Sequence, residues 1–443
     1  MPFPEERRLP SGYDGEVLVS GGGYVRAALG FFLTAVLTLA AVAATLPPAM
    51  PVAWETMRLV PSLNAAVADA RTPHWTFASG GAYSSSPVVV GGVTYLSDNN
   101  GNLNALDVAT GKPLWHAKFA NSLMSAPITA NGLVYVGEGN EDSTTYVPRS
   151  RVQVGLHDNA LIAVDAKSGR MRWRFALRGT GMPTSALVDG KLIHHDGYGD
   201  IVALDATTGA LRWRRDVRSV SSMSAVLPIA AGRLVSAGIF PNEVIAFNAA
   251  DGSSAWTRTF SGSASGLGDC PLAFDGTYLF GTYLGPVSKP VDPGDPAIHH
   301  LYALRASDGA LVWDRALERG DTPPRNEAAI PVVAGGVVYD GSSVAPYMHA
   351  LDAKTGRLLW KREVKGPVKG APIIVRGVVY FGDLHGYLWA LEAQTGRVLG
   401  ALRTGVRFNV GSPVAVGGSL LIGSVEGVVV MLPLAEFAKA KDF

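Results

Sequence analysis

The chain has 443 residues, and 38 Lys and Arg against 37 Asp and Glu give it a net charge of +1 at pH 7. This balance excludes the strongly basic surface that is typical of nucleic-acid-binding proteins, so we expect no nucleic-acid partner. The 52 Gly and 28 Pro favour an all-β body with many turns, and the single cysteine, Cys270, excludes an internal disulfide.

The N-terminal part contains one long apolar segment. Residues 27–46 carry no charge and are long enough to cross a bilayer as a helix. Three arginines precede this segment, so we expect residues 1–26 in the cytoplasm and the rest of the chain across the membrane. A cleavable signal peptide that ends at Ala41-Val42-Ala43 is the alternative. Residues 47–72, rich in Pro and Ala, are expected to form a tether.

One phrase of eleven residues occurs seven times in the remainder of the chain. Its first copy, Ala105–Trp115, reads ALDVATGKPLW, and six of the seven copies end in Trp. The copies begin at residues 105, 163, 203, 246, 303, 350 and 390. A repeat at this spacing predicts a fold built from one supersecondary unit used many times.

The unit around the second copy predicts four short strands. Residues 125–137 alternate apolar with small or polar side chains on both sides of the turn pair Asn131-Gly132, which indicates a hairpin. Residues 160–166 alternate in the same way, and a turn at Gly169 leads to a fourth strand that carries Trp173. Four such strands form one propeller blade. We expect the repeated tryptophans to dock each blade on its neighbour, and they are Trp75, Trp115, Trp173, Trp213, Trp256, Trp313 and Trp360.

Eight prolines, each expected at the start of an innermost strand, predict eight blades. They are Pro87, Pro127, Pro183, Pro228, Pro271, Pro331, Pro372 and Pro413. The last unit lacks its fourth strand, which we expect residues 73–77 to supply beside residues 428–434. The predicted fold is therefore an all-β, eight-bladed propeller of four-stranded antiparallel blades over residues 73–435. One N-terminal transmembrane helix precedes it, and residues 436–443 form a short tail.

With these repeats, the chain resembles the pyrroloquinoline-quinone (PQQ)-type propeller family, whose blades carry a tryptophan-docking motif. The resemblance covers roughly residues 71–435 and implies a central channel. The family includes quinoprotein alcohol and sugar dehydrogenases, and scaffolds such as the propeller lipoprotein of the outer-membrane barrel-assembly machinery. This chain has neither the adjacent cysteine pair of the dehydrogenases nor a C-x-x-C-H haem-attachment sequence. It therefore resembles the scaffold branch more than the dehydrogenases. Because the chain has no cysteine near residue 46, however, we expect no lipoprotein processing of the kind that anchors that scaffold.

Loops that enter the innermost strands are expected to lie at one end of the channel. The early blades place small or Met side chains there, among them Ser84, Ser85, Met124 and Met223. The later blades place charged and amide groups there, which would suit the carboxylates of PQQ and a Ca²⁺ ion. These cofactor-binding candidates are Asp269, Arg325, Asn326, Glu327, Lys369 and Arg407. The favoured interpretation is that these groups pair with one another around water, with no cofactor and no catalytic residue.

Metal binding is not predicted. The pairs His194-His195 and His299-His300 fall in expected strands, where adjacent side chains point to opposite faces. Neither pair is therefore expected to chelate one ion.

Two insertions between second and third strands interrupt the repeat, at residues 138–159 and 282–300. Long loops in a regular repeat are often functional, and we expect these two to contact other protein subunits. The sequence thus predicts a single-pass protein of the inner membrane whose propeller faces the periplasm. We expect it to act as a scaffold or accessory subunit of a membrane or envelope complex. A PQQ-dependent dehydrogenase that oxidises alcohols or sugars is the alternative.

Overall fold

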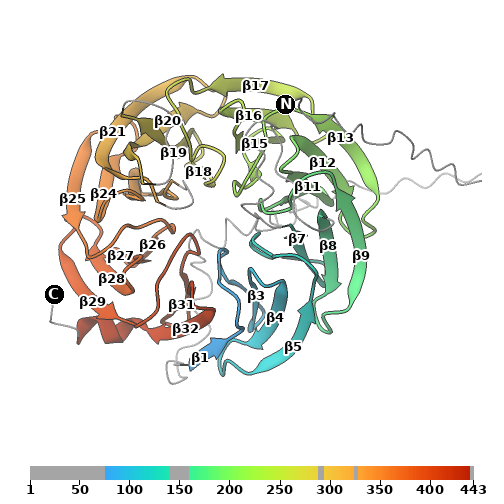
Figure 1. Ribbon diagram of the computed structural model, residues 1–443, viewed down its shortest axis with the longest axis horizontal. Coiled ribbons are helices and arrows are strands. Elements are labelled where there is room, and N and C mark those ends of the chain that lie inside the picture. The colour runs from blue at the N-terminus through green and yellow to red at the C-terminus, as the bar shows by residue number, and fades with distance from the viewer. Residues whose placement is uncertain (1–74, 140–158, 288–293, 324–327, 440–443) are drawn as a thin grey trace, which may run out of the picture. The chain divides into compact units, whose positions relative to one another are not determined.

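The computed structural model describes residues 75–139, 159–287, 294–323 and 328–439. They form eight four-stranded antiparallel sheets that follow one another around a central axis (Figure 1). The predicted eight-bladed propeller is confirmed. Within these ranges the one helical element is the 3₁₀ helix η2 (Leu434–Ala438), and no helix is long and apolar enough to cross a bilayer. The predicted span at 27–46 lies outside the described residues.

Each blade contributes one strand to each of four concentric positions. The innermost strands are β2 (Val88–Val90), β6 (Ile128–Ala130), β10 (Ala186–Val188), β14 (Leu227–Pro228), β18 (Ala273–Phe274), β22 (Val332–Ala334), β26 (Ile373–Val375) and β30 (Val414–Val416). The second strands are β3 (Val93–Ser97), β7 (Leu133–Glu138), β11 (Lys191–His195), β15 (Arg233–Gly238), β19 (Tyr278–Pro286), β23 (Val337–Gly341), β27 (Val378–Gly382) and β31 (Ser419–Gly423).

The remaining two positions complete the blades. The third strands are β4 (Asn102–Asp107), β8 (Asn159–Asp165), β12 (Asp200–Asp205), β16 (Glu243–Asn248), β20 (Pro296–Arg305), β24 (Tyr347–Asp352), β28 (Tyr387–Glu392) and β32 (Val428–Pro433). The outermost strands are β5 (Pro113–Lys118), β9 (Met171–Leu177), β13 (Leu211–Asp216), β17 (Ser254–Thr259), β21 (Leu311–Asp321), β25 (Leu358–Glu363), β29 (Val398–Arg403) and β1 (Trp75–Ala78).

Each repeated tryptophan docks on the motif of the following blade. The Trp115 indole N–H of blade one donates to the Ala166 carbonyl of blade two at 2.9 Å. The same indole covers Gly169, where a Cβ atom would lie only 2.6 Å from the ring. The motif therefore needs Gly at its seventh position because the tryptophan of the preceding blade occupies that space. The other indole N–H donors are Trp75, Trp173, Trp213, Trp256, Trp313 and Trp360.

The ring is closed between the two ends of the propeller. Strand β1 pairs with β32 and places Trp75 opposite Met431, so the first described strand becomes the outermost strand of blade eight. Trp75 then docks on blade one, where its indole N–H donates to the Val108 carbonyl at 3.0 Å. A closed ring leaves no blade flank open for pairing with another chain.

The seventh copy of the motif ends in Gly400 instead of Trp, and η2 packs at that place. A Cβ atom on Gly400 would lie 2.1 Å from the Phe437 carbonyl oxygen. The Phe437 side chain is 2% exposed and meets the Tyr380 ring at 5.2 Å. The described part of the predicted tail is thus packed against blade seven.

In blade five, the described part of residues 282–300 is mostly strand and not the inserted loop that we expected. Strand β19 continues to Pro286 and β20 begins at Pro296, so most of this insertion lengthens a hairpin. Strand β21 follows the extension as far as Asp321. Pro286 ends β19 and Pro296 begins β20, so these two prolines lie at the strand ends. In blade two, residues 140–158 of the other insertion lie outside the described residues.

Candidate functional site

Loops that precede the innermost strands line a small cavity on the propeller axis, of about 40 Å³. Seven of the eight blades contribute to it, because each blade brings the residues beside its first strand to the centre. Its polar and sulfur-bearing lining consists of Ser84, Ser85, Ser86, Thr184, Asp269, Met124 and Met223. We call this cavity the channel mouth.

The hydroxyl groups of the channel mouth are held by neighbouring blades. Ser86 Oγ accepts a hydrogen bond from the Ser412 N–H at 3.0 Å, across the joint with blade eight. Thr184 Oγ1 accepts from the Ala126 N–H at 3.0 Å, across the joint with blade two. Because a hydroxyl also carries one proton to donate, both groups remain able to bind an anionic oxygen.

Two anchors hold the loop that carries Asp269. The Gly268 carbonyl accepts hydrogen bonds from the N–H groups of Ser222, Met223 and Ser224 at 3.0–3.2 Å. Cys270, 2% exposed, donates through Sγ to the Ala328 carbonyl of blade six at 2.8 Å. These contacts hold the backbone on both sides of Asp269, which lines the cavity together with Met223.

Three of the six cofactor-binding candidates are described, and one of these three lines the channel mouth. Asp269 lines the channel mouth. Lys369 is 3% exposed, and its carbonyl accepts from the N–H of Ile330, a lining residue, at 3.0 Å. Arg407 has a side chain 63% exposed that pairs with Glu426 at 2.7 Å. The candidates Arg325, Asn326 and Glu327 lie outside the described residues.

The described part of the channel mouth does not fit PQQ. Sites for organic cofactors enclose roughly 300–1,000 Å³, whereas this cavity measures about 40 Å³. The Arg407 guanidinium is directed to Glu426 and does not line the cavity. Across the described residues, no group of three His, Cys, Asp or Glu could hold a metal ion.

Sequence reasoning placed Ser84, Ser85, Met124, Met223 and Asp269 on the channel, and all five line the cavity. It missed four further lining residues that are adjacent in sequence to the marker prolines, which are Ser86, Ala126, Thr184 and Ile330. The signal was present in the sequence, because a residue next to the proline that opens an innermost strand must lie near the axis.

Comparison with known proteins identifies the family. A family model described as "Outer membrane protein assembly factor BamB" matches residues 62–274 and 299–436, well over half of the chain. The chain belongs to the BamB family. The solved structure of BamB from Moraxella catarrhalis has the same fold, with a TM-score of 0.60 and 18% identity over 81% of this chain and 98% of that one.

Two relatives of this BamB-family chain have names that state different roles, one a hydrolase and the other an assembly factor. The tetrathionate hydrolase of Acidithiobacillus ferrooxidans is 28% identical over 365 residues, which are 79% of this chain and 72% of that protein. The assembly factor BamB of Burkholderia pseudomallei is 25% identical over 361 residues, which are 80% of this chain and 86% of that protein.

Proposed function

We propose that this chain hydrolyses a small sulfur-chain dianion of the tetrathionate class at the channel mouth, with Asp269 as the acid–base residue. One observation carries the proposal: a carboxylate lies in one axial cavity together with hydroxyl and thioether side chains. The likeness to a tetrathionate hydrolase along most of both chains supports the substrate class.

The lining residues suit both chemical parts of such a substrate. The terminal sulfonate oxygens are hydrogen-bond acceptors, and the Ser86 and Thr184 hydroxyls supply donors. The central sulfur atoms are polarisable and apolar, as are the thioethers of Met124 and Met223. A narrow linear dianion can enter a small cavity by one end, whereas a planar tricyclic quinone cannot.

The reaction needs one water molecule and no oxidant. Water attacks a terminal sulfonate sulfur, an S–O bond forms, and the adjacent S–S bond breaks with its electron pair on the leaving sulfur. Asp269 accepts the proton of the attacking water and returns it to the leaving sulfur. Tetrathionate and water thereby give hydrogen sulfate and a protonated sulfane-sulfonate anion, HS₃O₃⁻, and all atoms and charges balance.

A single carboxylate substitution tests this proposal. Purified protein is incubated with tetrathionate, and tetrathionate loss and sulfate release are followed by ion chromatography. We expect Asp269→Asn to lower the rate by about 10²–10⁴-fold, the usual contribution of a general acid–base group. Asp189→Asn is the matched control, because Asp189 lies in an exposed hairpin turn. Unchanged tetrathionate with the wild-type protein, or an active D269N variant, would refute the proposal.

A membrane-anchored scaffold that faces the periplasm is the second candidate function. It is favoured by the likeness to BamB proteins over most of their length and by the extended blade-five strands β19, β20 and β21. In this proposal residues 27–46 hold the protein in the inner membrane, and the hairpin and residues 138–159 meet other subunits.

One genetic experiment separates the two functions. A deletion strain is complemented with either the wild-type or the D269N chain. A scaffold predicts that both restore the level of outer-membrane β-barrel proteins. A hydrolase predicts that only the wild-type chain restores tetrathionate consumption.

A further inference from the structure

Three methionines occupy the same place in three successive blades. Met124, Met182 and Met223 each lie four residues before the first residue of an innermost strand, which is β6, β10 or β14. All three are buried, with exposed fractions of 4%, 1% and 9%, and they belong to one hydrophobic cluster. Because the innermost strands surround the axis, equivalent positions on adjacent blades bring these thioether side chains to the same part of the centre.

Backbone contacts two residues later hold the three loops in register. The Ala126 N–H donates to Thr184 Oγ1 at 3.0 Å, and Thr184 forms a β-bridge with Ala225. The Val226 N–H donates to the Thr184 carbonyl at 2.9 Å. Ala126, Thr184 and Ala225 each follow one of the methionines by two residues. The methionine of blade three therefore lies between those of blades two and four around the axis.

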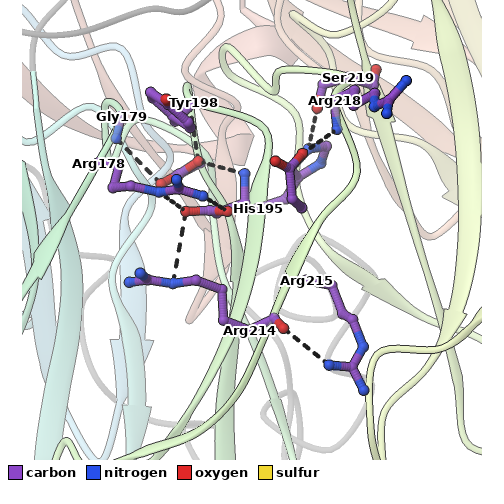
Figure 2. Close-up of polar contacts among 11 residues, drawn as sticks. Arg178, Gly179, His195, Tyr198, Arg214, Arg215, Arg218 and Ser219 are labelled. Atoms are coloured by element: carbon purple, nitrogen blue, oxygen red, sulfur yellow. Dashed lines mark hydrogen bonds and ion pairs between the residues drawn. The ribbon is translucent and has the colours of Figure 1, made fainter.

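Polar contacts fix the starts of the methionine-bearing loops of blades three and four (Figure 2). At the first loop, Arg178 donates through two nitrogens of its guanidinium to Asp200, whose side chain is 0% exposed. At the second loop, the His195 ring donates through Nε2 to the Ser219 carbonyl at 2.7 Å. These loops are thus held in place before any ligand arrives, as a preorganised site requires.

The space beside these side chains is not filled by packing. Met124 and Met223 both line the channel mouth, a cavity of about 40 Å³. Well-packed protein interiors leave few voids larger than a water molecule. This cavity therefore leaves room for one small ion beside the thioethers.

The chemistry of the side chains indicates which kind of ion this would be. A thioether is a soft, uncharged sulfur ligand, and soft thioether and thiolate ligands select Cu(I). Ca²⁺ and Mg²⁺ take oxygen ligands instead. Three thioethers from three adjacent blades can approach one ion from three directions.

We propose that Met124, Met182 and Met223 bind one soft monovalent cation, Cu(I), at the channel mouth. The ion stays Cu(I), so binding needs no oxidant or reductant. The proposal does not rest on hydrolysis at the channel mouth, because the ion binds in the absence of tetrathionate.

The test is competition for Cu(I) between the purified full chain and the chromogenic chelator bicinchoninic acid, without oxygen and with ascorbate. We expect the wild-type chain to take one Cu(I) from the chelator. The triple variant M124L, M182L, M223L keeps the side-chain volumes but has no sulfur ligands. Its affinity should fall by about 100-fold or more, because loss of even a group that orients a metal ligand costs about 10–100-fold. Met182→Leu alone should cost about 10-fold or more.

Matched variants keep this test decisive. Met348→Leu and Met431→Leu replace methionines that are 0% exposed in blades six and eight, and both should bind as the wild type does. Cys270→Ser keeps a donor for the Ala328 carbonyl but removes the thiol, and it should also bind normally. Urea midpoints show that each variant is folded, and X-ray absorption at the copper edge should detect sulfur neighbours.

Three results would each overturn the proposal. The first is a wild-type chain that takes no Cu(I) from the chelator. The second is a folded triple variant that binds Cu(I) as tightly as the wild type. The third is loss of binding in the folded Cys270→Ser variant, which would make the thiol the ligand.

Discussion

Replacing Trp75 by Ala removes the side chain that joins blade eight to blade one. The variant loses the indole hydrogen bond to the Val108 carbonyl and the packing of the ring over Gly111, where a Cβ atom would lie 2.5 Å from the indole. Large-to-small changes at a buried Trp cost about 3–5 kcal/mol, and Trp75 is only partly buried. We therefore expect a loss of about 3 kcal/mol in the free energy of unfolding, measured by urea denaturation.

The joint between blades eight and one can also be followed by amide hydrogen exchange. Strand β1 is held in blade eight by its pairing with β32, by the docked indole and by the packing of Phe77. We therefore expect faster amide exchange in Thr76 and Phe77 of the W75A variant, with little change in blade four. Trp75→Phe retains most of the apolar burial and should cost about 1 kcal/mol, the value of one hydrogen bond. A W75A loss below 0.5 kcal/mol would refute the role of docking in ring closure.

Two other predictions concern the repeat and the buried histidines. Gly400→Trp restores the repeated motif but forces an indole against the Phe437 carbonyl, so we expect the free energy of unfolding to fall by about 1–3 kcal/mol. A urea midpoint equal to or higher than that of the wild type would contradict the packing of η2. Burial lowers the pKa of His194 to about 3 and that of His195 to about 4, and it raises the pKa of Asp196 to about 6. Between pH 4.5 and 5.5 the unfolded chain therefore binds two protons on the histidines, while the folded chain binds one on Asp196. These groups should therefore lower the free energy of unfolding by about 1.4 kcal/mol for each pH unit of acidification. The variant His194→Gln should remove this pH dependence, as measured by urea titrations at several pH values. An unchanged pH dependence would show that His194 is protonated in the folded chain.

The blade architecture could be predicted because short sequence patterns within each repeat determine it. The proline before each innermost strand and the seven-fold phrase with Gly and Trp each encode one turn or one contact with the next blade. The use of η2 in place of a tryptophan at Gly400 could not be predicted in the same way. Its partner, Phe437, lies 37 residues later, outside the repeat.

For the candidate site, the sequence predicted which loops lie near the axis but not which of their side chains line the cavity. Asp269 and Met223 were placed on the axis because they precede first strands. Arg407 occupies an equivalent loop, but Glu426 from the following hairpin takes its guanidinium and its backbone N–H.

Hydrolysis of tetrathionate in ¹⁸O-labelled water tests the central claim most directly. Because the attacking water supplies one oxygen to the terminal sulfonate sulfur, we predict sulfate with a single ¹⁸O atom from the wild-type protein. The D269N variant should release labelled sulfate at least 100-fold more slowly. Absence of labelled sulfate, or equal release by wild-type and D269N protein, would contradict catalysis at the channel mouth.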